Sequence, residues 1–111
     1  MSVVETIKEQ IESNDILLYM KGTPRFPQCG FSSRASEAIM SCDARFAFVN
    51  ILESPEIRAE LPKYANWPTF PQLWIKGELI GGCDIIAEMA ASGELKELID
   101  SVAVNADSAE S

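Results

Sequence analysis

The sequence predicts an α/β fold in which a mixed sheet of about four strands lies between helical layers. Residues 16–20 form an unbroken apolar run of strand length, as expected of a central strand that is covered on both faces. A second apolar run, at 46–52, is joined to the first through a helical pattern, which favours a right-handed βαβ unit with parallel strands. Residues 73–75 and 78–80 flank Lys76-Gly77 and indicate an antiparallel hairpin.

The first half of the chain shows a helix, a strand, a loop and a second helix. Apolar residues recur at helical spacing over 3–13, which predicts a short amphipathic helix. Residues 21–28 contain one Gly and two Pro, so we expect a loop at the carboxyl end of the strand at 16–20. Open α/β sheets bind ligands at such ends. Small and apolar residues at helical spacing then predict a helix over 32–42.

The second half completes the sheet and supplies further helices. The pair Ser54-Pro55 fits the cap and the first position of a helix over 54–64. After the hairpin, we expect Asp84 to cap a helix that runs to about residue 89. A last helical stretch places apolar side chains inward over 95–102.

Composition indicates a globular protein and argues against two classes of partner. The 111 residues are 47% hydrophobic and 23% charged, which excludes a wholly disordered, collagen-like or coiled-coil chain. We expect one domain over 1–104 and a disordered tail over 105–111, because the tail is small and polar. The net charge of −8 repels phosphate backbones and anionic headgroups. We therefore expect neither nucleic acid nor a membrane as a partner.

The absence of histidine and the odd number of cysteines limit the catalytic chemistry that the chain can perform. The chain contains no histidine, which excludes Ser-His and Cys-His nucleophile pairs. It has three cysteines, an odd number, and no recognisable signal peptide, which together favour reduced thiols rather than a disulfide scaffold. No apolar run approaches the roughly 20 residues that span a bilayer. A cytoplasmic location is therefore expected.

Cys29 is the strongest candidate for a reactive group. It follows the loop after a central strand and stands at the start of a helix, where unpaired N–H groups and the helix dipole favour a thiolate. Residues 16–36 contain no acid but include Lys21, Arg25 and Arg34. These cations should lower the pKa of the thiol and attract an anionic thiol ligand. The alternative is a buried structural cysteine beside chance basic residues.

The other cysteines have no partner at a characteristic spacing. Cys29-Gly30-Phe31-Ser32 carries serine where a dithiol oxidoreductase would carry its resolving cysteine, so no disulfide can form within this motif. Cys42 lies on the apolar face of its predicted helix, which favours a core position. Cys83 is either structural or opens a helix with Asp84, where backbone N–H groups can receive a carboxylate.

The segment Thr69-Phe70-Pro71 is a second feature of interest. A proline that enters a strand lacks a ladder donor and is a candidate for a cis peptide bond. That isomer would turn the backbone groups of Phe70 toward whatever occupies the site. Proline at a strand edge is ordinary by itself, so this feature gains weight only beside Cys29.

Four segments together resemble the monothiol glutaredoxins of the Cys-Gly-Phe-Ser class. They are Tyr19-Met20-Lys21-Gly22-Thr23-Pro24, Cys29-Gly30-Phe31-Ser32, Trp67-Pro68-Thr69-Phe70-Pro71-Gln72 and Gly81-Gly82-Cys83-Asp84. The resemblance covers roughly residues 3–102 in register, and the tail carries no family signal.

The resemblance implies a thioredoxin-like fold with a four-stranded mixed sheet flanked by helices. It implies that Cys29 is both the reactive thiol and an iron ligand, and that Pro71 is a cis-proline. The residues that it places around glutathione are Lys21, Arg58, Phe70, Pro71, Cys83 and Asp84. Without the resemblance, Arg58 would be interpreted as a solvated helix charge, and Lys63 stays an undecided candidate.

Two functions follow, and both stay open at this stage. In the first, a 2Fe-2S cluster takes one thiolate from each of two chains and two from glutathione, since such clusters ordinarily need four. The family resemblance implies a cluster-bridged homodimer, or a heterodimer with a BolA-type protein, that delivers clusters to apo iron–sulfur proteins. In the second, the Cys29 thiolate reduces glutathionylated proteins, for which no second protein thiol is needed. The resemblance implies that proteins of this class reduce disulfides poorly, which favours the function as a cluster carrier.

Overall fold

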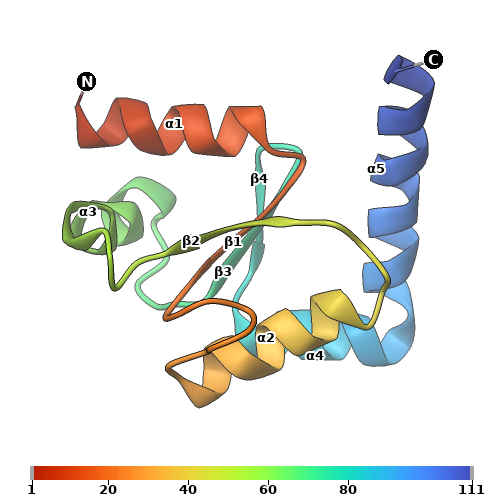
Figure 1. Ribbon diagram of the computed structural model, residues 1–111, viewed down its shortest axis with the longest axis horizontal. Coiled ribbons are helices and arrows are strands. Elements are labelled where there is room, and N and C mark those ends of the chain that lie inside the picture. Colours follow the sequence, from red (N-terminus) through yellow and green to blue (C-terminus); the bar gives the residue numbers. More distant parts are fainter. Residues whose placement is uncertain (1, 111) are drawn as a thin grey trace.

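The computed structural model describes residues 2–110, with side chains described over residues 2–102. Within these residues, five helices accompany one four-stranded sheet (Figure 1). In chain order the elements are α1 (Val3–Ser13), β1 (Ile16–Met20), α2 (Gly30–Met40), β2 (Ala47–Asn50), α3 (Pro55–Ala65), β3 (Gln72–Ile75), β4 (Glu78–Gly81), α4 (Cys83–Ser92) and α5 (Glu94–Glu110).

The sheet has the strand order β2-β1-β3-β4. β1 pairs with β2 in parallel and with β3 in antiparallel fashion, and β3 and β4 form the antiparallel hairpin. All five residues of β1 are buried, as expected of a strand with helices on both sides. The predicted α/β class, the βαβ unit and the hairpin are therefore confirmed.

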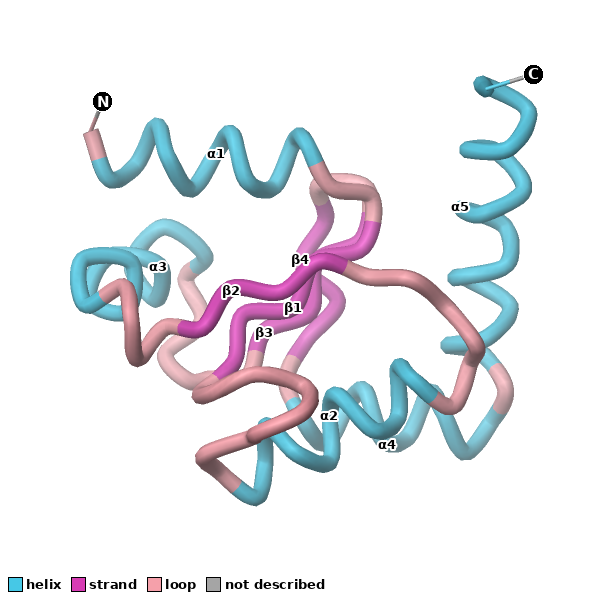
Figure 2. The backbone as a smooth tube through the Cα atoms, in the orientation of Figure 1, coloured by secondary structure: helices cyan, strands magenta, loops and turns pink. Residues whose placement is uncertain are grey.

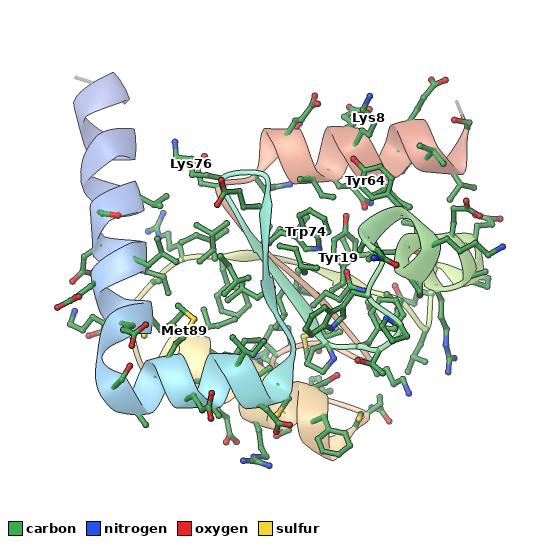
Figure 3. The ribbon with its side chains drawn as sticks, turned by 180° about the vertical axis from the view of Figure 1, so that it is seen from behind. Lys8, Tyr19, Tyr64, Trp74, Lys76 and Met89 are labelled. Atoms are coloured by element: carbon green, nitrogen blue, oxygen red, sulfur yellow. The ribbon has the colours of Figure 1, made fainter. Side chains whose placement is uncertain are left out.

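Two apolar cores lie on opposite faces of the sheet, because successive side chains of a strand point to opposite sides. Leu17 and Tyr19 of β1 belong to the core beneath α1 and α3, whereas Leu18 and Met20 belong to the core covered by α2, α4 and α5 (Figures 1 and 2). Figure 3 shows Tyr19 near Trp74 on the α1 and α3 side. The carboxyl ends of β1 and β2 are thus fixed between two packed layers.

The element boundaries differ from the predicted ones at several places. α2 begins at Gly30 rather than residue 32, so that Cys29 becomes its N-cap. The strand predicted over 46–52 is confined to 47–50, where it pairs with β1. Asp84 does not cap α4 as we expected, because Gly82 occupies the N-cap and Asp84 lies in the first turn.

At the C-terminal end of the chain, α5 extends to Glu110, and residues 94–110 contain no Gly or Pro that would end a helix. The predicted disordered tail over 105–111 stays a prediction. The division of the chain at residue 104 stays a prediction, and Ser111 lies outside the described residues. No helix in the described part of the chain combines the length and the apolar character needed to cross a membrane.

Candidate functional site

Cys29 stands at the N-cap of α2 with its side chain partly exposed. Its carbonyl oxygen accepts the first helical hydrogen bond, from Ser33 N–H (2.9 Å), so the N–H groups of the first turn are left without helical partners. Hydrogen bonding from the Ser32 backbone N–H is the main cause that lowers the pKa of the thiol. Burial opposes this effect, while Phe31 N–H, the Lys21 charge and the Ser32 hydroxyl lower the pKa further. The geometry therefore favours a thiolate.

Only part of the predicted basic surroundings acts on the thiol. Lys21 is the cation whose charge lowers the Cys29 pKa. Arg25 and Arg34 are exposed, and neither contributes to that pKa. The helix N-terminus thus affects the sulfur more than the surrounding cations do.

Alkylation of Cys29 is expected to follow its lowered pKa. The thiolate is the nucleophile, so the rate with iodoacetamide should stay high below the pH at which an ordinary thiol is protonated, and should fall as the pH drops through the lowered pKa. Replacing Lys21 with Met removes a cation that stabilises the thiolate, and should move the midpoint of the rate profile to higher pH. Mass spectrometry of the Cys29 peptide measures this rate, and an unchanged midpoint would show that Lys21 does not act on the thiol.

The loop between β1 and α2 brings Lys21 to this position. Gly22 has a φ of +91°, and a Cβ there would lie 2.5 Å from the carbonyl oxygen of Phe26, so only glycine fits. Gln28 N–H donates to the Lys21 carbonyl (3.0 Å) and closes the loop. The N–H of Lys21 donates to Oγ of Ser32 (3.0 Å), which is fully buried. The serine of the motif is therefore an acceptor that ties β1 to α2.

A groove with a cavity volume of about 740 Å³ lies beside the start of α2, and its lining includes Lys21 and Phe31 but not Cys29 itself. It brings together residues from the loop after β1, from α2 and α3, from the loop before β3 and from the start of α4. The lining residues are Lys21, Phe31, Arg58, Pro62, Trp67, Pro68, Thr69, Phe70, Gly82, Cys83, Asp84 and Ile85. Five of the six residues predicted around glutathione are therefore in the lining. The sixth, Pro71, is buried behind it, and Lys63 is exposed outside it.

The wall formed by residues 67–71 is held by a residue behind it. The Phe70–Pro71 peptide bond is cis, in agreement with the sequence-based expectation. Gln72 is fully buried, and its Nε2 donates to the carbonyl oxygens of Trp67 (3.1 Å) and Thr69 (3.2 Å). Phe70 takes part in none of the hydrogen bonds found between described residues. Its backbone groups are therefore available to an extended peptide in the groove.

The N-terminus of α4 forms another part of the lining. Gly82 provides no side-chain cap, and Ile86 N–H makes the first helical bond, to Gly82 O (2.9 Å). The preceding N–H groups, those of Cys83 and Asp84 among them, have no helical partner and can receive a carboxylate. The Asp84 carboxylate is exposed beside them and can accept from an ammonium group. The Cys83 side chain is 8% exposed and belongs to the core, so this residue serves the groove through its backbone.

Several lining residues were not identified by sequence reasoning. Trp67 is the main one: its Nε1 is the single buried side-chain nitrogen or oxygen without a hydrogen-bond partner over the described residues. Trp67, Thr69 and Gln72 belong to one of the segments that resemble the family. That resemblance is the sequence signal that could have identified them. Trp67 and Thr69 line the groove and Gln72 lies behind them, and these positions depend on tertiary packing that the sequence pattern does not show.

Comparisons with known proteins identify the family of this chain. A family model described as Glutaredoxin matches residues 16–80. The chain belongs to the glutaredoxin family. Two curated relatives are both named Glutaredoxin 4. The one from Buchnera aphidicola is 67% identical over 89% of this chain and 92% of its own length, and the one from Escherichia coli is 59% identical over 98% and 95%.

Solved structures show the same fold. The solution structure of reduced poplar apo GrxS14 has a TM-score of 0.78 and 45% identity, and covers 93% of this glutaredoxin and 94% of its own chain. That of a monomeric truncated mutant of Trypanosoma brucei 1-C-Grx1 has a TM-score of 0.80 and 33% identity, with 91% and 92% covered. The predicted resemblance and the thioredoxin-like fold are thus confirmed.

Proposed function

We propose that this glutaredoxin carries a 2Fe-2S cluster, ligated by Cys29 and glutathione in a bridged dimer, and delivers it to apo-proteins. One observation carries the proposal: a partly exposed thiol with a lowered pKa lies beside a groove that can hold a thiol peptide. The chain supplies one reactive sulfur, and the groove is suited to bring a second.

The groove matches the chemistry of glutathione from end to end. Glutathione carries two carboxylates, one ammonium group and one thiol. Lys21 and Arg58 can pair with one carboxylate, and the free N–H groups at the start of α4 can receive the other. The backbone of Phe70 can bind the peptide in strand fashion, and Asp84 can accept from the ammonium. The thiol of the peptide would then lie toward Cys29.

The cysteine positions account for a dimer. A 2Fe-2S cluster ordinarily takes four thiolates. Cys42 and Cys83 are buried, and no group of three or more His, Cys, Asp or Glu side chains that could hold a metal occurs among the described residues. One thiolate from each of two chains and one from each of two glutathione molecules complete the set. Because half of these ligands are exchangeable small molecules, the cluster is cargo that can be passed on.

The partners and the compartment belong to the same proposal. The recipients are apo iron–sulfur proteins, and a BolA-type protein can replace one copy of the chain in a heterodimer. These partners rest on the family resemblance. A reducing compartment, the cytoplasm, is consistent with three free thiols.

Glutathione-dependent reduction is the second candidate function, and the exposure of Cys29 favours it. The Cys29 thiolate would attack the glutathione sulfur of a glutathionylated protein and release the protein thiol. A second glutathione thiolate would then attack the resulting mixed disulfide, which restores Cys29 and yields glutathione disulfide. Ser32 does not prevent this sequence, since no resolving protein thiol is required.

Anaerobic reconstitution tests which of the two candidate functions the protein performs. The chain is incubated with iron, sulfide and glutathione, and its visible absorbance and molecular mass are recorded. A coloured dimer that needs glutathione is expected. A colourless monomer that turns over a glutathione mixed disulfide would contradict the carrier function and support the reductase.

Arg58→Met is expected to weaken glutathione binding by about two- to fivefold, the effect of losing an exposed charge pair worth up to about 1 kcal/mol. The substitution removes the guanidinium while keeping an apolar side chain in the groove. Lys63→Met is the matched control, because Lys63 lies in the same helix but outside the lining. Titration calorimetry with glutathione measures both. An equal effect of the two substitutions would exclude a specific contact of Arg58.

A further inference from the structure

Asn50 lies outside the groove but is bonded to the loop that forms one of its walls. It is the last residue of β2 and is paired with Met20, the last residue of β1. Its Oδ1 accepts hydrogen bonds from Gly22 N–H (2.9 Å) and from Leu52 N–H (3.0 Å). A single side-chain oxygen therefore joins the end of the edge strand to the glycine that follows Lys21.

Two successive N–H groups of the loop are held by side chains of different elements. Lys21 N–H donates to Ser32 of α2, and Gly22 N–H donates to Asn50 of β2. In Figure 2 the loop that begins after β1 leads directly into α2. The backbone at Lys21 and Gly22, which we call the Lys21 corner, is thus held by hydrogen bonds to both α2 and β2. A third hydrogen bond, from Gln28 N–H to the Lys21 carbonyl, closes the loop.

We propose that Asn50 is a positioning residue that holds Lys21 in its binding orientation in the groove. The inference deepens the proposed function and rests on it, since glutathione is the ligand concerned. Lys21 lines the groove and has a flexible side chain. Its contribution to binding is therefore reduced by the entropy cost of ordering the residue when glutathione binds. Fixing the backbone at Gly22 reduces that cost. Asn50 itself touches neither the groove nor the thiol.

The Gly22 N–H has no simple replacement for this partner. The residue is buried and has a positive φ, and the loop backbone packs closely around it, since a Cβ built there would lie within 3 Å of Phe26 O and Gln28 N. Without Asn50 Oδ1, the Gly22 N–H must turn toward water to find another acceptor, and the backbone at Lys21 and Gly22 becomes less ordered. The affinity for an anionic ligand should fall only to the extent that Lys21 takes part in binding.

A double-mutant cycle measures this dependence. Glutathione affinity is determined by titration calorimetry for the unchanged chain, Asn50→Leu, Lys21→Met and the double variant. Asn50→Leu is expected to weaken binding by about three- to fivefold, up to the value of one net hydrogen bond. In the Lys21→Met background the same substitution should have little further effect. Asn50→Asp, which keeps an acceptor oxygen of the same shape, should restore binding to within about twofold.

Gln10→Leu is the matched control. Gln10 Oε1 accepts from the hydroxyl of Tyr19 (2.9 Å), so this variant also breaks one side-chain hydrogen bond to β1, away from the groove. It should lower stability without changing glutathione affinity in either background. An equal loss of affinity in Gln10→Leu would assign the effect of Asn50 to general destabilisation and overturn the proposal.

The remaining outcomes separate this inference from the proposed function. Additive effects of Asn50→Leu and Lys21→Met, or no effect of Asn50→Leu, would overturn the positioning role while leaving glutathione binding intact. If the unchanged chain bound no glutathione, both the proposed function and the positioning role would be wrong. Asn50→Ser, whose side chain is too short to reach Gly22 N–H, gives the same test if Asn50→Leu does not fold.

Discussion

Cys29→Ser is expected to abolish assembly of the 2Fe-2S cluster while the fold is retained. The hydroxyl of serine does not ionise near neutral pH, so each chain loses its one accessible thiolate ligand. The side chain of Cys29 makes no capping hydrogen bond at the start of α2, and serine is a favoured residue there. The free energy of unfolding should therefore stay equal or rise by up to about 1 kcal/mol. Visible absorbance and bound iron measure assembly, and urea unfolding measures stability.

Cys42→Ala is the control for this prediction. Cys42 is 6% exposed and packs in the core beneath α2, where its sulfur donates to the carbonyl of Ala38 (3.5 Å). Its removal should lower stability slightly and leave cluster assembly nearly unchanged. Full cluster content in Cys29→Ser would contradict the assignment of Cys29 as a ligand, and loss of colour in Cys42→Ala would show that its core assignment is incomplete.

Gly22→Ala is expected to lower the free energy of unfolding by about 2–4 kcal/mol and to weaken glutathione binding. The methyl group would meet Phe26 O at 2.5 Å and Gln28 N at 2.7 Å, and both are backbone atoms that cannot move without opening the loop. The positive φ and the overpacking each cost roughly 1–2 kcal/mol or more. Because Lys21 is the neighbouring residue, the displaced loop should also disturb the groove. Urea unfolding and calorimetric titration measure the two effects.

Gly77→Ala separates the two causes. Gly77 also has a positive φ, of +81°, but nothing lies within 4 Å of the position of its Cβ. This variant should lose only about 1 kcal/mol, from backbone strain alone, and should keep its affinity for glutathione. Equal losses of stability in the two variants would mean that the loop yields to the added methyl group and that steric crowding at Gly22 is not important.

Local pattern was sufficient for most of the fold. The apolar run at 16–20 identified the central strand, because a strand covered on both faces is apolar at nearly every position and this run has the length of a strand. The start of α4 was placed wrongly at Asp84. A residue that prefers the cap was chosen, whereas the turn out of β4 puts Gly82 at that position.

The candidate site was predicted unevenly. Cys29 could be found from the sequence because a helix start, a preceding loop and the local charge agree within a few neighbouring positions. Arg58 needed the family resemblance, since nothing near it in sequence marks it. Gln72 and Asn50 could not be assigned a role, because their partners lie on other segments that only folding brings within hydrogen-bond distance.

The sequence by itself determined the secondary-structure order, the candidate cysteine and the family, since these depend on periodicity, capping chemistry and motif spacing along the chain. The tertiary structure decided which residues line the groove, which side chains accept from the N–H groups of Lys21 and Gly22, and that the Cys83 side chain is buried. The physical reason is that a binding groove is made of walls from distant segments. The hydrogen bonds and the close packing between these segments exist only after the sheet and helices have packed.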